Sequence, residues 1–166
     1  AAVDGMAYGG GFALALQADF ILASERTKFC SVFGRIGLVP DMAVFYALPR
    51  AVGMQNAKDL MFTARSIDVA EADAMDLVYA IHPEAELLAA AHALATRLAQ
   101  GSKHAIGVTK KIVNRSFQSD YSTMAQMEAD GQAIMATTDF HKEAVRRFQG
   151  KETPLYNWDA MDKAQD

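Results

Sequence analysis

The run Gly9-Gly10-Gly11 is the place in this sequence where residue types and spacing most clearly could do chemistry. It follows a short apolar segment and precedes an apolar helical pattern. Glycine lets the backbone approach a ligand closely, and the first N–H groups of a helix have no acceptor within it. An oxyanion or phosphate could therefore bind at this turn. A tight strand-to-helix turn without a ligand explains the same residues equally well.

Other residues with reactive side chains give weaker signals. Asp41 precedes a helical pattern that starts at Met42, so its residue type favours an N-cap. Cys30, the single cysteine, is typical of a small buried apolar residue. No two histidines have the spacing of metal ligands, and we predict no metal site from His82, His92, His104 and His141.

Composition narrows the class of protein. The 166 residues are 51% hydrophobic and 22% charged, which is ordinary for a globular domain. A net charge of −4 makes nucleic acid a poor partner. No apolar run reaches the roughly 20 residues of a membrane-spanning helix, and a lone cysteine suits the cytoplasm. The chain starts without methionine, inside an apparent strand, so we expect a fragment whose partner strands lie upstream.

Short strands and helices must position these residues. Apolar runs predict strands at 1–3, 19–24, 28–33 and 76–81. Helical spacing predicts helices at 10–17, 42–49, 54–63 and 69–75, and then only helices at 83–99, 102–115, 121–135 and 139–148. The pattern predicts an α/β region over residues 1–100, followed by a helical region over residues 101–166.

Several elements in a fixed order cover nearly the whole chain. They are Gly5-x-x-x-Gly9-Gly10-Gly11, Ala18-Asp19, Lys28-Phe29, Gly37-Leu38-x-Pro40-Asp41, Leu48-Pro49-Arg50-x-x-Gly53 and Leu77-Val78. Together they resemble the crotonase, or enoyl-CoA hydratase/isomerase, family. The resemblance implies a superhelix of ββα turns, a helical C-terminal region used for trimerisation, and an acyl-CoA thioester substrate with no other cofactor.

The resemblance also implies a role for the glycine turn. In this family two backbone N–H groups bind the thioester oxygen and stabilise an enolate, and the second donor falls on Gly10. The first donor would lie upstream of Ala1. The substrate-binding residues that we infer beside Gly10 are Tyr8, Gly9, Phe12, Phe33 and Phe45. Phe148 and Lys151 resemble the family's Phe-x-x-Lys, which meets the adenine and phosphates of CoA, often across a subunit boundary.

The acid–base residues decide the reaction type. Hydratases of this family use two glutamates, which would fall on Ala13 and Phe33, so hydration is not supported. An acidic residue at the position of Asp41 is the proton-shuttling base of certain isomerases, including those that act on ring-opened epoxyphenylacetyl-CoA in phenylacetate degradation. The run from Val32 to Asp41 most resembles the latter. We therefore predict an enoyl-CoA isomerase with Gly10 and Asp41 as catalytic residues.

Two alternatives remain open. Aroyl-CoA dehalogenases of the family have a nucleophilic aspartate at the same position, but they also have a tryptophan where this chain has Phe33. The loss of both glutamates would also suit a non-catalytic protein that binds acyl-CoA. Whatever the reaction, we expect the chain to assemble as a homotrimer or homohexamer, because residues 83–148 supply more apolar helical faces than the α/β layer can cover. A valine at position 10 should stop turnover and conflict with the backbone angles of the turn.

Overall fold

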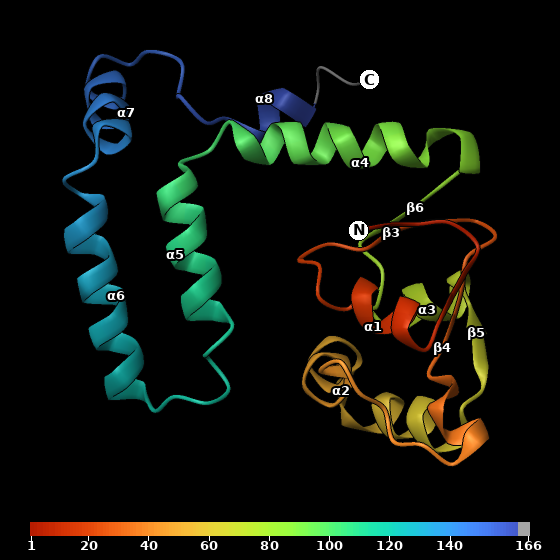
Figure 1. Ribbon diagram of the computed structural model, residues 1–166. Helices are drawn as coiled ribbons and strands as arrows, with labels where there is room; N and C mark the ends of the chain where they lie inside the picture. Colours follow the sequence, from red (N-terminus) through yellow and green to blue (C-terminus); the bar gives the residue numbers. More distant parts are fainter. Residues whose placement is uncertain (163–166) are drawn as a thin grey trace. The chain divides into compact units, whose positions relative to one another are not determined.

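The computed structural model describes residues 1–162 and divides into two compact units, residues 1–93 and residues 94 onward. The first unit holds all the strands of the described chain, and the second is helical (Figure 1). The division falls inside α4 (Glu84–Ala99), ahead of the boundary predicted at residue 100. The mixed α/β class with a helical C-terminal region is confirmed.

Two three-stranded sheets form the frame of the first unit. The first contains only parallel pairs and is ordered β1 (Ala2–Val3), β3 (Leu22–Ser24), β6 (Ala80–His82). The second pairs β2 (Met6–Tyr8) with β4 (Lys28–Cys30) in parallel and β4 with β5 (Ser66–Asp68) in antiparallel. The chain passes from the first sheet to the second through Gly5, whose φ of 79° favours glycine.

The core of the first unit lies where its helices meet the strands. The helices are α1 (Gly10–Ala15), α2 (Val44–Thr63) and α3 (Val69–Ala74), and α2 bends at Gly53. Phe12 of α1 packs against Phe29 of β4, with ring centroids 5.5 Å apart. Both are buried together with Leu48, Leu60 and Ile67. Burial of this cluster anchors α1 and the start of α2 to the sheets.

Three local predictions for the first unit were wrong. Residues Val32–Ile36 form a 3₁₀ helix instead of extending a strand, because the ladder between β2 and β4 ends at Cys30. Strand β5 was not predicted, because only Ile67 of its three residues is buried and gives an apolar signal. Helix α2 begins at Val44 instead of Met42.

The second unit contains α5 (Lys103–Val113), α6 (Tyr121–Met135), α7 (Asp139–Gln149) and α8 (Trp158–Asp162). Side chains of Ser102, Asp120 and Thr138 accept hydrogen bonds from backbone N–H groups and cap three of them. The sequence predicted those three helices but not α8, where the Trp158 ring lies 3.9 Å from the Arg97 guanidinium. Within residues 1–162, no helix has the length and apolar character needed to cross a bilayer.

Candidate active site

The glycine turn joins β2 to α1 and depends on Gly9. Gly9 has φ 53° and ψ −117°, and a Cβ added there would meet Val32 Cγ2 at 3.1 Å. Gly10 has no positive φ, and a Cβ added there would lie 3.7 Å from Met42 Sδ, an ordinary contact. The expectation that the backbone angles require glycine at position 10 was therefore wrong. They require it at position 9.

The N–H of Gly10 lies at the first position of α1. Among residues 1–162 it donates to no hydrogen bond, as is usual for the first turn of a helix. Gly10 is partly exposed, whereas Gly9 is buried. A free N–H at a surface turn can donate to the oxygen of a bound ligand.

Asp41 does not cap α2, so the N-cap interpretation was wrong. The cap position belongs to Ala43, and no side chain accepts from the first turn. Met42 and Ala43 have φ values of 50° and 64°, and the Val44 N–H donates to the Asp41 carbonyl at 3.1 Å. These two residues form a tight turn that separates Asp41 from the helix. The Asp41 side chain is exposed and makes no hydrogen bond or ion pair with any residue from 1 to 162.

The structure brings the turn that carries Asp41 against α1. The Met42 sulfur lies beside Gly10, and the Gln17 side chain donates from Nε2 to the Met42 carbonyl at 3.2 Å. The two residues predicted to be catalytic, Gly10 and Asp41, are therefore on neighbouring segments. Sequence reasoning missed Gln17, whose partner is 25 residues away.

The four aromatic residues predicted near Gly10 lie in different environments. The Phe33 ring is partly buried, with Cζ 4.0 Å from the Cβ position of Gly9, and Phe45 in the first turn of α2 is 56% exposed. Phe12 is 1% exposed, so it supports α1 from inside the core. The Tyr8 hydroxyl is 2.7 Å from Ser66 Oγ and is hydrogen-bonded to it. Phe33 is therefore placed at the glycine turn, whereas Phe12 is a packing residue.

Phe148 and Lys151, in the second unit, lie on a common cavity of about 480 Å³ together with Phe140 and Tyr156. Lys151 has a φ of 53° and follows α7. Its N–H donates to the Phe148 carbonyl at 3.2 Å, and the Glu152 N–H donates to the Arg147 carbonyl at 2.9 Å. These are the two bonds of a Schellman motif, and Lys151 occupies the position usually held by glycine.

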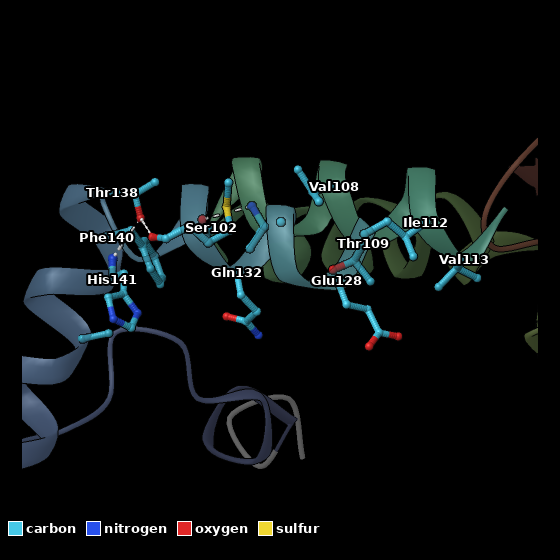
Figure 2. Close-up of a pocket in the computed structure, with 14 residues that line it drawn as sticks. Ser102, Val108, Thr109, Ile112, Val113, Glu128, Gln132, Thr138, Phe140 and His141 are labelled. Atoms are coloured by element: carbon cyan, nitrogen blue, oxygen red, sulfur yellow. Dashed lines mark hydrogen bonds between the residues drawn. The ribbon is translucent and has the colours of Figure 1, made fainter. Parts of the chain in front are cut away.

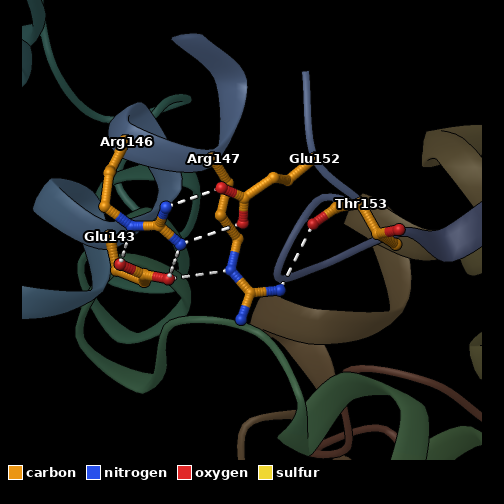
Figure 3. A network of polar contacts seen from close by, with 5 residues as sticks. All are labelled: Glu143, Arg146, Arg147, Glu152 and Thr153. Atoms are coloured by element: carbon orange, nitrogen blue, oxygen red, sulfur yellow. Dashed lines mark hydrogen bonds and ion pairs between the residues drawn. The ribbon is translucent and has the colours of Figure 1, made fainter. Parts of the chain in front are cut away.

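A network of charged side chains secures this turn (Figure 3). Arg146 binds Glu143 with Nε 2.7 Å from Oε2 and binds Glu152 with Nη1 2.6 Å from Oε1. Arg147 donates from Nε to Glu143 Oε1 at 2.9 Å and from Nη1 to the Thr153 carbonyl at 3.3 Å. Hydrogen bonds from Arg146 and then Arg147 lower the pKa of Glu143 to about 2. The network ties the end of α7 to the segment after Lys151.

A second, larger groove of about 650 Å³ lies among α5, α6 and α7 (Figure 2). Its walls are largely apolar, with Val108, Ile112 and Met135, and Glu128, Gln132 and His141 add polar groups. No sequence prediction pointed to this groove. Over residues 1–162, no three His, Cys, Asp or Glu residues are grouped so that they could hold a metal ion.

Comparisons with known proteins find similar sequences and structures over nearly the whole chain. Residues 1–159 match the family described as enoyl-CoA hydratase/isomerase. The chain is 35% identical to the "Probable enoyl-CoA hydratase echA8" of Mycobacterium tuberculosis, over 94% of this chain and 61% of that protein. It is 28% identical to the 1,2-epoxyphenylacetyl-CoA isomerase of Escherichia coli, over 93% of this chain and 59% of that protein.

A solved structure is similar to the chain over almost the same length. The crystal structure of an enoyl-CoA hydratase/isomerase from Cupriavidus metallidurans superimposes with a TM-score of 0.88 at 41% identity, covering 92% of this chain and 58% of that one. The chain thus spans about three-fifths of the length of the relatives that it matches.

Proposed function

The chain belongs to the enoyl-CoA hydratase/isomerase (crotonase) family, and we propose that it acts as an enoyl-CoA isomerase that moves a double bond through a thioester enolate. The exposed carboxylate of Asp41, on a turn packed against the helix that begins at Gly10, is the observation that carries this proposal. One acid–base group is enough for this reaction, because it can remove a proton from the α carbon and return it at the γ carbon.

The alternative of a two-carboxylate hydration is less well supported. Hydration needs one group to activate water and another to deliver a proton. The positions of the family's two glutamates hold Ala13, which is fully buried in the core, and Phe33, and neither side chain titrates. Relatives with names of both kinds, hydratase and isomerase, match the chain, so isomerisation and hydration both have to be measured.

In this proposal the N–H of Gly10 donates to the thioester oxygen. Such a donor stabilises charge that develops in the transition state, and losing one costs roughly 3 kcal/mol. Gly9 shapes the turn, and Tyr8, Phe33 and Phe45 contribute to substrate binding. Phe148 and Lys151 bind the adenine and phosphates of CoA, which enters as part of the substrate and is the only cofactor-derived group involved.

Assembly through the second unit is part of the same proposal, as a homotrimer or homohexamer in the cytoplasm. Of residues 94–161, only Leu94 and Gly131 are buried. Phe117 is 78% exposed and Tyr121 is 88% exposed, so the helices leave large apolar side chains uncovered. A stable monomer in light scattering of the full-length protein would refute this part.

The experiment replaces Asp41 with asparagine in the full-length protein and offers a 3-enoyl-CoA. Absorbance of the conjugated 2-enoyl product reports isomerisation, and solvent deuterium reports exchange at the α carbon. We expect Asp41→Asn to lower kcat about 10²–10⁴-fold, the usual contribution of general acid–base catalysis. Asp73→Asn is the matched control, because Asp73 is also exposed in the first unit and its side chain makes no hydrogen bond or ion pair within residues 1–162.

Other results of these assays would contradict the proposal, and some of them would indicate a different function. Full activity of Asp41→Asn would refute Asp41 as the acid–base group. Loss of absorbance from a 2-enoyl-CoA in water would indicate hydration, and halide release from a haloaroyl-CoA would indicate a dehalogenase. Acyl-CoA binding without turnover of any of these substrates would indicate a non-catalytic member.

A further inference from the structure

The turn that carries Asp41 has an unfavourable backbone conformation. Met42 and Ala43 have φ values of 50° and 64°, and the Val44 N–H closes the turn on the Asp41 carbonyl. Two consecutive positive φ values at the centre of a closed turn are the mark of type I′, in which glycine, asparagine and aspartate predominate. Neither Met42 nor Ala43 is of that kind. Such a conformation persists only where its surroundings hold it.

The Asp41 carboxylate depends on this turn for its position. Its side chain is exposed and makes no hydrogen bond or ion pair with residues 1–162, so no polar contact of the side chain fixes it there. The backbone from Asp41 to Ala43 is what places it. A group that holds this backbone therefore also places the carboxylate.

The side chain of Gln17 donates a hydrogen bond to the turn. Gln17 directly follows the C-cap residue of α1, Leu16. Its amide nitrogen has two hydrogens, and both have acceptors: the Ala13 carbonyl at 3.3 Å and the Met42 carbonyl at 3.2 Å. The amide thereby connects the end of α1 to the turn. Gln17 is exposed, so this connection involves no core packing.

Helix α1 contacts the same turn again at its other end. The Met42 sulfur lies 3.7 Å from the position that a Cβ of Gly10 would occupy. These two contacts, one from Gly10 in α1 and one from Gln17 just after it, both involve Met42, the first through its side chain and the second through its carbonyl. Helix α1 therefore joins the proposed thioester donor, at its first residue Gly10, to Gln17, which follows its C-cap.

We propose that Gln17 is a positioning residue, which holds the turn at Met42 and thereby sets where the Asp41 carboxylate stands relative to the Gly10 N–H. This inference rests on the proposed function. It assigns a specific role in the reaction to an exposed glutamine that contacts no reacting atom. Small displacements of a catalytic group lower the rate strongly, while ground-state binding of a distant part of the substrate is unaffected.

The test compares three variants of the full-length protein with the 3-enoyl-CoA assay. Gln17→Leu keeps the side-chain size but has no donor, and we expect kcat to fall at least about tenfold with KM changed less than twofold. Gln17→Lys restores a donor of similar reach, and we expect at least half of the wild-type kcat. Gln55→Leu is the control, because Gln55 is also exposed and its side chain makes no hydrogen bond within residues 1–162.

A double variant distinguishes positioning of Asp41 from general destabilisation. In an Asp41→Asn background, Gln17→Leu should leave the residual rate unchanged, because the carboxylate that Gln17 positions is gone. A further fall in rate there, or full activity of Gln17→Leu alone, would overturn the inference. If Asp41→Asn is itself fully active, the proposed function fails instead, and the two failures are therefore distinguishable.

Discussion

Replacing Lys151 with glycine is expected to make the protein more stable and to weaken its binding of acyl-CoA. Lys151 has a φ of 53° at the C′ position of the Schellman motif that ends α7. A non-glycine residue in this region costs roughly 1–2 kcal/mol. Glycine removes that cost but adds about 0.4–1 kcal/mol of chain entropy to the unfolded state. The balance is a stabilisation of about 0.5–1 kcal/mol, or about 1–4 °C in Tm for a chain of this size.

The same substitution, Lys151→Gly, is expected to weaken the binding of acyl-CoA. Lys151 is exposed on the cavity that it shares with Phe148, so solvent screens any contact it makes with a phosphate. An exposed charge pair contributes about 1 kcal/mol or less, which corresponds to an increase in Kd of up to about fivefold. The network of Arg146, Glu143 and Glu152 does not use the Lys151 side chain and should hold the turn in the variant.

Thermal unfolding followed by circular dichroism measures the first effect, and calorimetric titration with an acyl-CoA measures the second. Lys151→Arg keeps the charge and the strain, so both quantities should stay close to wild type. Lys142→Ala removes a different cation from α7, one that pairs with Asp139 at 3.6 Å, and should leave the affinity unchanged. A Lys151→Gly protein with lower stability would refute the strain argument, and one with unchanged affinity would refute the CoA contact.

Three further predictions concern the glycine turn and the charged network. Gly9→Ala should destabilise the protein by about 1–3 kcal/mol in denaturant titrations, because its φ and the 3.1 Å contact both oppose a Cβ. Gly10→Val should fold and yet lose at least tenfold in turnover, whereas Gly11→Ala, with no atom within 4 Å of its added Cβ, should keep full activity. Glu143→Gln should lower Tm at pH 7. The pKa of Glu143 in the folded protein is about 2, below its usual 4.5. The Tm difference between variant and wild type should therefore be largest above pH 4.5 and should disappear as the pH falls towards 2. A difference that stays constant over that range would contradict the network.

The sequence by itself determined most of the local structure of this protein. Helices α5, α6 and α7 were predictable because their stabilising contacts are local: apolar residues recur at helical spacing, and Ser102, Asp120 and Thr138 cap their own first turns. The glycine turn between β2 and α1 was visible for the same reason, since the positive φ of Gly9 is a property of one residue. The order of the motifs was enough to indicate the family.

Only the tertiary structure decided what surrounds Asp41. Residue type favoured an N-cap, and neither Met42 nor Ala43 favours the positive φ values that move the start of α2 to Val44. The contacts that accompany those angles come from Gly10 and Gln17, far away in the chain. The burial of Phe12 against Phe29 likewise depends on the pairing of β2 with β4. Contacts between distant segments leave no periodic pattern in the sequence, so the position of the candidate base relative to the candidate oxyanion donor is set by tertiary contacts, one a hydrogen bond and one a packing contact.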